Sequence, residues 1–270
     1  MMNWSDVVSV LSLPDSARVD QRVPKKLLLE NGAPTASDKR LISDAIEDIQ
    51  WLAALKPNTI GVPEYRDAQR EYLEVAVLAA TLRAAAKPAS FSRLAELVHR
   101  AVPYPVLLLL DKERAEGSTL TLSLAHKRWA QNEAGKIVLD GDLVSTSLFQ
   151  AADGRPGADA KAASHIEQDF VQSLAITRQP QASLNVLYEG WIVCVQALHA
   201  ARRTGIYQTA ATPEQTAARR QALIDCRWLE REISRLRAEA AKEKQLARQV
   251  ELNLTLKRIQ AELAAAQQQL

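Results

Sequence analysis

YPVLLLLDKE, residues 104–113, is the stretch that decides the fold. It places five apolar residues in succession, Val106–Leu110, directly after Pro103 and Pro105. A continuous apolar run of this length after such a turn signal is typical of a strand that is buried on both faces of a sheet. The sequence therefore predicts a sheet whose middle lies at this run.

The segments around this run supply further strands and one helix. Residues 118–129, STLTLSLAHKRW, alternate apolar and polar with Leu120, Leu122 and Leu124 on one face, which predicts a strand with one buried face. Further strands are predicted at 71–82, 135–141 and 142–149, and a helix at 90–102. This order of elements predicts an α+β domain over residues 1–150, with a mixed β-sheet and flanking helices.

The first part of the chain is predicted to be helical. Short helices are expected at 3–12 and between Pro24 and Gly32. Residues 34–57 give the clearest helical pattern, because apolar side chains recur at helical spacing until Pro57 stops the run. The members of that stripe are Leu41, Ile42, Ala45, Ile49 and Leu52.

Beyond residue 150 the pattern becomes helical. Residues 151–164 are rich in Gly, Ala and Asp without an apolar period, and are interpreted as a linker. A helical segment is expected over 165–207. Residues 213–270 contain neither Gly nor Pro after Pro213, and are expected to form a coiled-coil helix or a helical hairpin.

This C-terminal segment carries an apolar seam that steps by three and four residues. A polar interruption around Lys242–Lys244 divides the seam into two runs. A lone helix cannot bury such a stripe, so it must fold back as a hairpin, pair with a second copy in a homo-oligomer, or lie on a partner. The residues assigned to this coiled-coil interface are Leu229, Ile233, Leu236, Ala240, Leu252, Leu256, Ile259 and Leu263.

The composition is that of an ordinary globular protein and disfavours several classes of function. Of the 270 residues 47% are apolar and 24% charged, and a net charge of +2 implies no partner by itself. Cys194 and Cys226 form no metal or redox motif, and neither a GxxxxGK[ST] loop nor a GxGxxG turn follows a strand, so no cofactor is expected. Without a signal peptide or an apolar run of ~20 residues, we expect a cytoplasmic protein without membrane contact.

A cluster of basic and aromatic residues ends the predicted strand at 118–129. In an extended strand His126 and Arg128 share the face of the leucines, whereas Lys127 and Trp129 point the other way. Such a strand end can grip a phosphate backbone or stack on a base. It can equally be a strand that leaves the core with its long side chains in water.

A second basic group lies near the N-terminus, in RVDQRVPKK at residues 18–26. Arg22, Lys25 and Lys26 are candidates for contact with an acidic partner or a nucleic acid. The alternative is a solvated helix start, in which these side chains have no partner.

A metal-dependent nuclease is a third hypothesis. Its chemistry needs acidic residues that converge on a metal ion, usually with a nearby lysine. Glu71 and Glu74 lie in one predicted strand, and Asp111, Lys112 and Glu113 end another. Because Lys112 lies between the two acids, it faces away from both in an extended strand, which is a poor geometry. No catalytic residue and no metal ligand is assigned.

Several long segments resemble an uncharacterised prokaryotic family, domain of unknown function 4391. The resemblance is carried by residues 18–65, 70–83, 94–110, 122–131 and 240–263, and it extends over nearly the whole chain. It implies a genomic setting rather than an active site. Members of the family are typically encoded beside superfamily-2 helicases and site-specific DNA methyltransferases, in clusters that resemble restriction-modification and phage-defence loci.

These observations lead to three hypotheses for the function. The first is a non-enzymatic accessory subunit of a helicase–DNA methyltransferase defence system, which contacts its partner through the C-terminal coiled coil. The second is a DNA- or RNA-binding module that uses the basic strand end at His126–Arg128. The third is the divergent nuclease.

Overall fold

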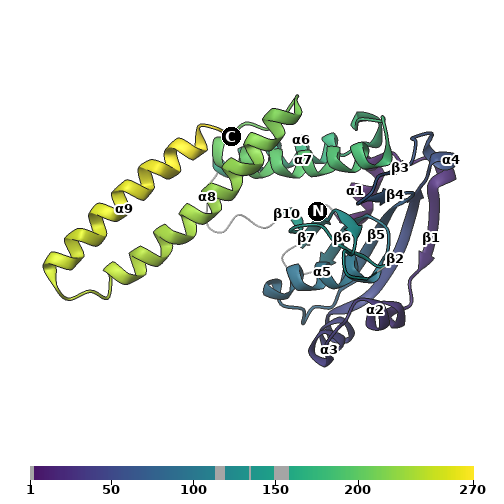
Figure 1. Ribbon diagram of the computed structural model, residues 1–270, viewed down its shortest axis with the longest axis horizontal. Helices are drawn as coiled ribbons and strands as arrows, with labels where there is room; N and C mark the ends of the chain where they lie inside the picture. Colours follow the sequence, from purple (N-terminus) through teal and green to yellow (C-terminus); the bar gives the residue numbers. More distant parts are fainter. Residues whose placement is uncertain (1–2, 113–118, 134, 149–157) are drawn as a thin grey trace. The chain divides into compact units, whose positions relative to one another are not determined.

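The computed structural model describes residues 3–112, 119–133, 135–148 and 158–270. Contacts within the chain divide it into two compact units, Met1–Val195 and Gln196–Leu270. The first contains the sheet and the second consists of helices (Figure 1). The predicted α+β class, a mixed sheet with helices followed by a helical C-terminal region, is confirmed.

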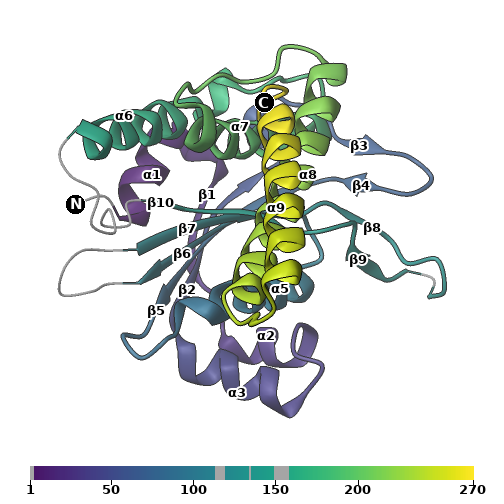
Figure 2. The ribbon, with the colours of Figure 1, turned by 90° about the vertical axis from the view of Figure 1, so that its left-hand side faces the viewer.

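The first unit is built on a six-stranded sheet in the order β1-β2-β5-β6-β7-β10 (Figure 2). Its strands are β1 (Arg18–Arg22), β2 (Ile46–Leu55), β5 (Val75–Leu82), β6 (Val106–Lys112), β7 (Thr119–Leu124) and β10 (Val144–Leu148). Only β5 and β6 are parallel, and every other neighbouring pair is antiparallel. The strand β6 is buried along its whole length, as the apolar run predicts.

Helices cover both faces of this sheet. On one face α2 (Lys25–Asn31), α3 (Ala36–Ala45) and α5 (Phe91–Ala101) pack against the apolar side chains of β5 and β6. On the other face lie α1 (Trp4–Leu11), α6 (Ala158–Ser173) and the first half of α7 (Leu184–Thr204) (Figure 2). The helix α5 joins the parallel strands β5 and β6, because a parallel pair needs a crossover connection.

The helix predicted over residues 34–57 is wrong in its second half. The helix α3 ends at Ala45, and the chain continues directly into the ten-residue strand β2. The pairing of β2 with β5 shifts register between Ile46 and Asp48 and again between Trp51 and Ala53. These bulges break the two-residue alternation of a strand, so Ile46, Ile49 and Leu52 imitate the spacing of a helix.

The strand predicted over residues 118–129 ends at Leu124. The next residues turn away into β8 (Lys127–Trp129), which pairs with β9 (Ile137–Leu139) outside the main sheet. The strand β7 is buried on both faces rather than on one. A second small hairpin joins β3 (Tyr65–Arg66) to β4 (Glu71–Tyr72), and β4 occupies the start of the strand expected at 71–82.

Other segments depart from the expected boundaries. The strand β1 was not predicted, because its sequence RVDQR is polar and exposed. The helix α6 begins at Ala158, inside the segment interpreted as a linker, whereas residues 151–157 of that segment lie outside the described residues. The short helices are η1 (Asp15–Ala17), α4 (Pro57–Ile60), η2 (Pro88–Ser90) and η3 (Ile176–Arg178).

The second unit is dominated by a helical hairpin, formed by α8 (Pro213–Ala240) and α9 (Leu246–Gln267). The two helices run side by side in opposite directions (Figure 1). Their shared core consists of Leu229, Ile233, Leu236, Leu256 and Ile259, with Leu252 and Leu263 packed against it, and is called the hairpin seam below. No helix in the described part of the chain is both long and apolar enough to cross a membrane.

Candidate functional site

His126 lies in a chain of three polar side chains rather than at the surface. The Tyr72 hydroxyl donates to His126 Nδ1 at 2.5 Å, and His126 Nε2 lies 2.6 Å from Glu189 Oε2. Burial raises the pKa of Tyr72 well above its ordinary value, so its hydroxyl stays protonated and available to donate. With the Tyr72 hydroxyl as donor, the ring accepts at Nδ1 and can donate to Glu189 at Nε2.

Tyr188, the residue before Glu189 on α7, binds the same region of the sheet. Its hydroxyl accepts from the Ala125 amide at 2.8 Å and donates to the Val106 carbonyl at 2.7 Å. Tyr188 is fully buried, and its ring contacts those of Tyr72 and His126. Two consecutive residues thus attach α7 to the break between β7 and β8, which gives His126 a positioning role in the fold.

Lys127 is buried, with only 3% of its surface exposed. Its ammonium donates to the carbonyl oxygens of His99, at 2.7 Å, and Val102, both at the C-terminal end of α5. Burial lowers the pKa of Lys127 to about 7. The side chain is therefore buried, so the interpretation as a solvated strand end is wrong for this residue. Contact of Lys127 with a nucleic acid or a partner stays a prediction.

The remaining two residues of the HKRW cluster are half-buried. Arg128 lies 3.5 Å from the carboxylate of Asp140, which also accepts two hydrogen bonds from Arg70. The amide of Trp129 donates to the carbonyl of Gln69, so the β8–β9 hairpin is held against the β3–β4 hairpin. The four residues therefore point into different surroundings and do not form one binding surface.

The N-terminal basic residues also have partners within the fold. Arg22 forms an ion pair with Asp48 on the neighbouring strand, and Lys25 Nζ donates to the Ile46 carbonyl at 2.5 Å. Lys26 is 3.6 Å from Glu30, one turn along α2. Arg22 and Lys26 keep most of their side chains in solvent, whereas the amine of Lys25 attaches the start of α2 to β2.

The acidic residues of the nuclease hypothesis lie at opposite ends of the sheet. Glu74 precedes β5 at the end where Ala76 pairs with Val106, whereas Asp111 pairs with Thr81 at the other end. Glu74 forms an ion pair with Lys56 at 2.9 Å, and Asp111 accepts from the Trp4 amide. Glu113 lies outside the described residues, within which no three His, Cys, Asp or Glu side chains converge as metal ligands.

The hairpin presents a second apolar surface that the sequence reasoning missed. Leu246, Val250 and Leu254 of α9 are 75%, 50% and 65% exposed, and this set is called the outer stripe below. Leu254 lies two residues from Leu252 and Leu256, a rotation of about 200° at 3.6 residues per turn, so the stripe faces away from the seam. The sequence does contain a signal for this stripe, because Leu246, Val250 and Leu254 are spaced by four residues, about one helical turn.

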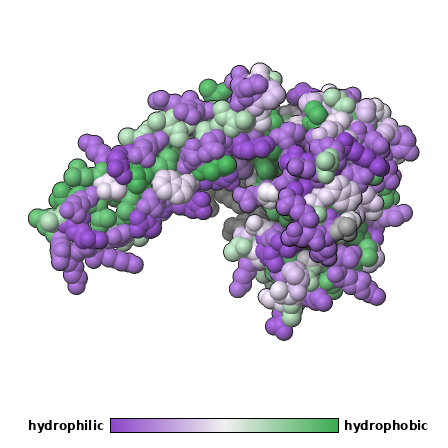
Figure 3. Space-filling view, in the orientation of Figure 1, coloured by the Kyte–Doolittle hydropathy of each residue, from purple (hydrophilic) through white to green (hydrophobic). Residues whose placement is uncertain are grey.

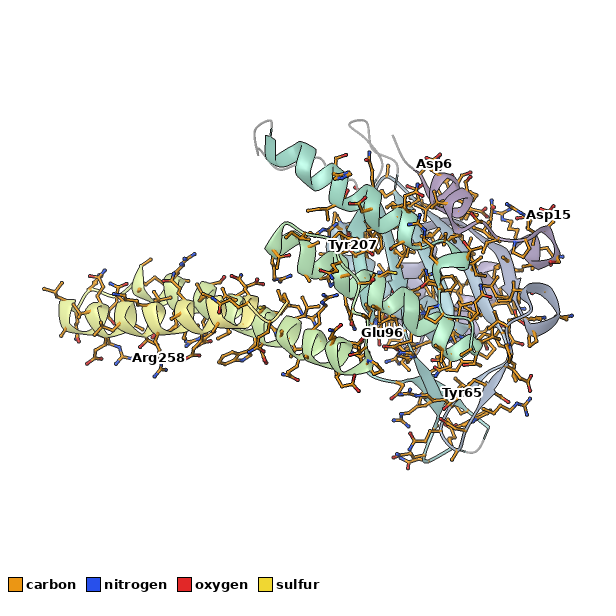
Figure 4. The ribbon with its side chains drawn as sticks, turned by 90° about the horizontal axis from the view of Figure 1, so that it is seen from above. Asp6, Asp15, Tyr65, Glu96, Tyr207 and Arg258 are labelled. Atoms are coloured by element: carbon orange, nitrogen blue, oxygen red, sulfur yellow. The ribbon has the colours of Figure 1, made fainter. Side chains whose placement is uncertain are left out.

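The surface of the hairpin carries both apolar and charged side chains. Figure 3 shows apolar side chains along the visible face of the hairpin. Elsewhere on its outside the hairpin carries charged side chains, of which Arg258 on α9 is seen in Figure 4, 3.6 Å from Glu262. On α8, Ile224 and Trp228 are also exposed, at 45% and 55%.

Comparison with known proteins identifies a family and nothing more specific. A family model described as Domain of unknown function (DUF4391) matches residues 11–263, nearly the whole chain. Neither the curated proteins nor the solved structures that were compared contain a match.

Proposed function

We propose that this chain, which belongs to the DUF4391 family, is a non-enzymatic assembly subunit that holds a partner protein on the outer stripe of α9. The observation that carries the proposal is the exposure of Leu246, Val250 and Leu254 on the side of α9 that faces away from α8. Aliphatic residues spaced by one helical turn are the anchors by which a helix binds an apolar groove.

The energetics favour association through this stripe. Burial of an exposed Leu or Val side chain contributes about 1.5–3 kcal/mol, so three such residues can supply much of a protein–protein affinity. We do not assign partner binding to the seam, because Leu229, Ile233 and Leu236 already pack against α9. Only 4–6% of the surface of each residue is exposed. We therefore assign the partner interface to the outer stripe and not to the seam, where the sequence had placed it.

The partner that we propose is the helicase or the DNA methyltransferase encoded with the chain. The family resemblance supports this assignment, since its members are typically found beside such enzymes in clusters of restriction and phage-defence type. The sequence has neither a GxxxxGK[ST] loop nor a GxGxxG turn after a strand, and so would act together with these neighbours. In this proposal the chain contributes assembly to a DNA-handling complex.

Affinity purification of the tagged full chain from its native gene cluster tests the proposal. The triple variant Leu246→Asp, Val250→Asp, Leu254→Asp should lose the co-purifying enzyme, because each carboxylate would have to be desolvated in the interface. The matched control changes Ser234, Ala238 and Gln260 to Asp. These residues are also exposed on the hairpin, and the control adds the same charge.

Circular dichroism of both triple variants should show the helical content of the unmodified chain. Retention of the helicase or methyltransferase by the outer-stripe variant contradicts the proposal. Loss of self-association without loss of an enzyme, measured by light scattering, would identify a second copy of this chain as the occupant and would likewise contradict it.

A further inference from the structure

We propose that a cavity between α2, α5 and the β8–β9 hairpin binds a small organic anion, with Lys127 as the cation that receives the anionic end. The cavity has a volume of about 360 Å³. It is bounded by Glu30–Pro34 at the end of α2, by Arg100 and Val102 at the end of α5, and by Lys127 and Lys136–Leu139. The proposal does not depend on the outer stripe.

The hydrogen bonds of Lys127 leave it able to bind a ligand. An ammonium has three N–H donors, and two of them are used by the carbonyls of His99 and Val102. Among the described residues no carboxylate forms an ion pair with Lys127, whose hydrogen bonds there go to these two neutral carbonyl oxygens. An anion in the cavity would accept the third N–H and neutralise a charge that is otherwise buried without a counter-ion.

The charges around the cavity favour an anion. Arg100, Lys136 and the acid Glu30 line it together with Lys127. Arg100 forms an ion pair with Glu96 and Lys136 one with Glu133, each at 2.6 Å. The side chains of Arg100 and Lys136 are 47% and 56% exposed, so they lie toward solvent while Lys127 is buried. Within the described residues Lys127 is therefore the cation of this lining that no carboxylate neutralises, and its charge would attract a small anion to the cavity.

The cavity also has an apolar wall, which defines the rest of the ligand. Ile137, Val138 and Leu139 line it and are only half-buried. Ala33 and Pro34, which follow α2, also belong to the lining. A ligand with one anionic group and a short aliphatic body would match both parts of the lining.

One nitrogen of a second polar side chain at this cavity, His99, lacks a hydrogen-bond partner within the described residues. His99 is fully buried and lines the cavity, and its Nε2 lies 3.0 Å from Ser123 Oγ. Its Nδ1 has no hydrogen-bond partner within the described part of the chain. Burial lowers the pKa of His99 to about 3, so the ring is neutral. Buried polar atoms without a hydrogen-bond partner are uncommon in native proteins, and a bound ligand or ion is one explanation for such an atom.

The altered ionisation of Lys127 gives binding a measurable signature. With a pKa of about 7, Lys127 is mostly neutral at pH 8 in the free protein. An anion favours the protonated form, so binding at pH 8 should be accompanied by uptake of close to one proton. Affinity should therefore decrease by up to tenfold for each pH unit above 7.

Isothermal titration calorimetry of the full chain with hexanoate, and separately with butyl phosphate, tests the proposal. We expect saturable binding of one equivalent of at least one probe at pH 8, and measurements in two buffers of different ionisation enthalpy should give the proton uptake. Hexanoate alone would assign a carboxylate ligand, and butyl phosphate alone a phosphate ester. Lys127→Met should weaken binding at least tenfold, whereas Lys39→Met, at an exposed position on α3, should leave it unchanged.

Two outcomes would overturn the proposal. Absence of saturable binding by both probes would show that Lys127 only caps the end of α5. Binding that Lys127→Met leaves unchanged would place the anion elsewhere. If Lys127→Met does not fold, the exposed substitutions Arg100→Glu and Lys136→Glu must lower the affinity at least threefold, and their failure to do so is equally decisive.

Discussion

The two units of the chain differ in which side chains they bury and which they expose. In the sheet unit, Lys127, His99 and Tyr188 are buried and hydrogen-bonded to the backbone or to other side chains. In the hairpin unit the seam consists of aliphatic residues alone, and further aliphatic residues remain exposed on the outer stripe. Buried polar groups fix the position of individual atoms, whereas an exposed apolar helix face binds by area. Under the two proposals above, the sheet unit would bind a ligand and the hairpin would bind a partner.

The largest expected effect comes from truncating one leucine in each unit. Leu108→Ala in β6 should lower the free energy of unfolding of the sheet unit by about 3–5 kcal/mol, because Leu108 is fully buried between two covered faces. Leu236→Ala in the seam should cost the hairpin only about 2–3 kcal/mol, because a two-helix core relaxes around the lost volume more easily. Hydrogen–deuterium exchange of the full chain reports the two units separately, and equal losses in both would remove this distinction.

A smaller effect is expected from the pH dependence of the sheet unit. The pKa of Lys127 is lowered to about 7 in the folded chain, from 10.5 in the unfolded chain. Between these values the unfolded chain binds a proton that the folded chain does not, so stability rises with pH and falls as pH is lowered toward 7. From pH 7 to pH 9 the gain from this residue is about 2 kcal/mol.

Urea unfolding of the unmodified chain and of Lys127→Met, each at pH 7 and pH 9, measures this gain as the difference between the two chains. The hairpin supplies the control, since Lys242 and Lys244 are exposed. Lys242→Met should follow the pH dependence of the unmodified chain. An equal pH dependence of the unmodified chain and Lys127→Met would show that Lys127 keeps its ordinary ionisation.

The smallest effect is expected where the two units use the same local device. Thr35 accepts a hydrogen bond from the Asp38 amide at the start of α3, and Thr212 accepts one from the Gln215 amide at the start of α8. Replacement of either threonine by Ala should cost about 1 kcal/mol in its own unit. Exchange protection of the first turn of each helix checks this, and a much larger loss for Thr35→Ala would mean that the adjacent Asp38–Arg93 ion pair depends on the cap.

How far the sequence predicts the structure differs between the units for a physical reason. The residues that pack together in the hairpin can be identified from the sequence, because a heptad repeat is a local pattern and both helices carry it. The strand β6 can also be identified, because it is buried on both faces. In contrast, β2 depends on its pairing with β1 and β5, and its bulges hide its alternation.

The partners of the HKRW cluster, residues 126–129, could not be predicted from the sequence either, because they also depend on tertiary structure. A strand that continued through Trp129 would have put Lys127 on the opposite face from His126. The break at Ala125 instead directs Lys127 to the carbonyls that end α5, and His126 to Tyr72 and Glu189. These partners lie between 25 and 63 residues away along the chain. The pairing of such distant residues follows from tertiary structure, which a local sequence pattern does not predict.

The exposed strand β1 has a consequence for the behaviour of the protein in solution. It forms one edge of the sheet, and an edge strand with free backbone groups can add a strand from another molecule and start aggregation. Here Arg18, Asp20 and Arg22 place alternate charges on the edge. Asp20 has a positive φ of 49°, and the register shifts between Arg18 and Gln21, so the edge is neither flat nor regular. The polar segment that resembles a binding site in the sequence thus protects the sheet from unwanted intermolecular pairing.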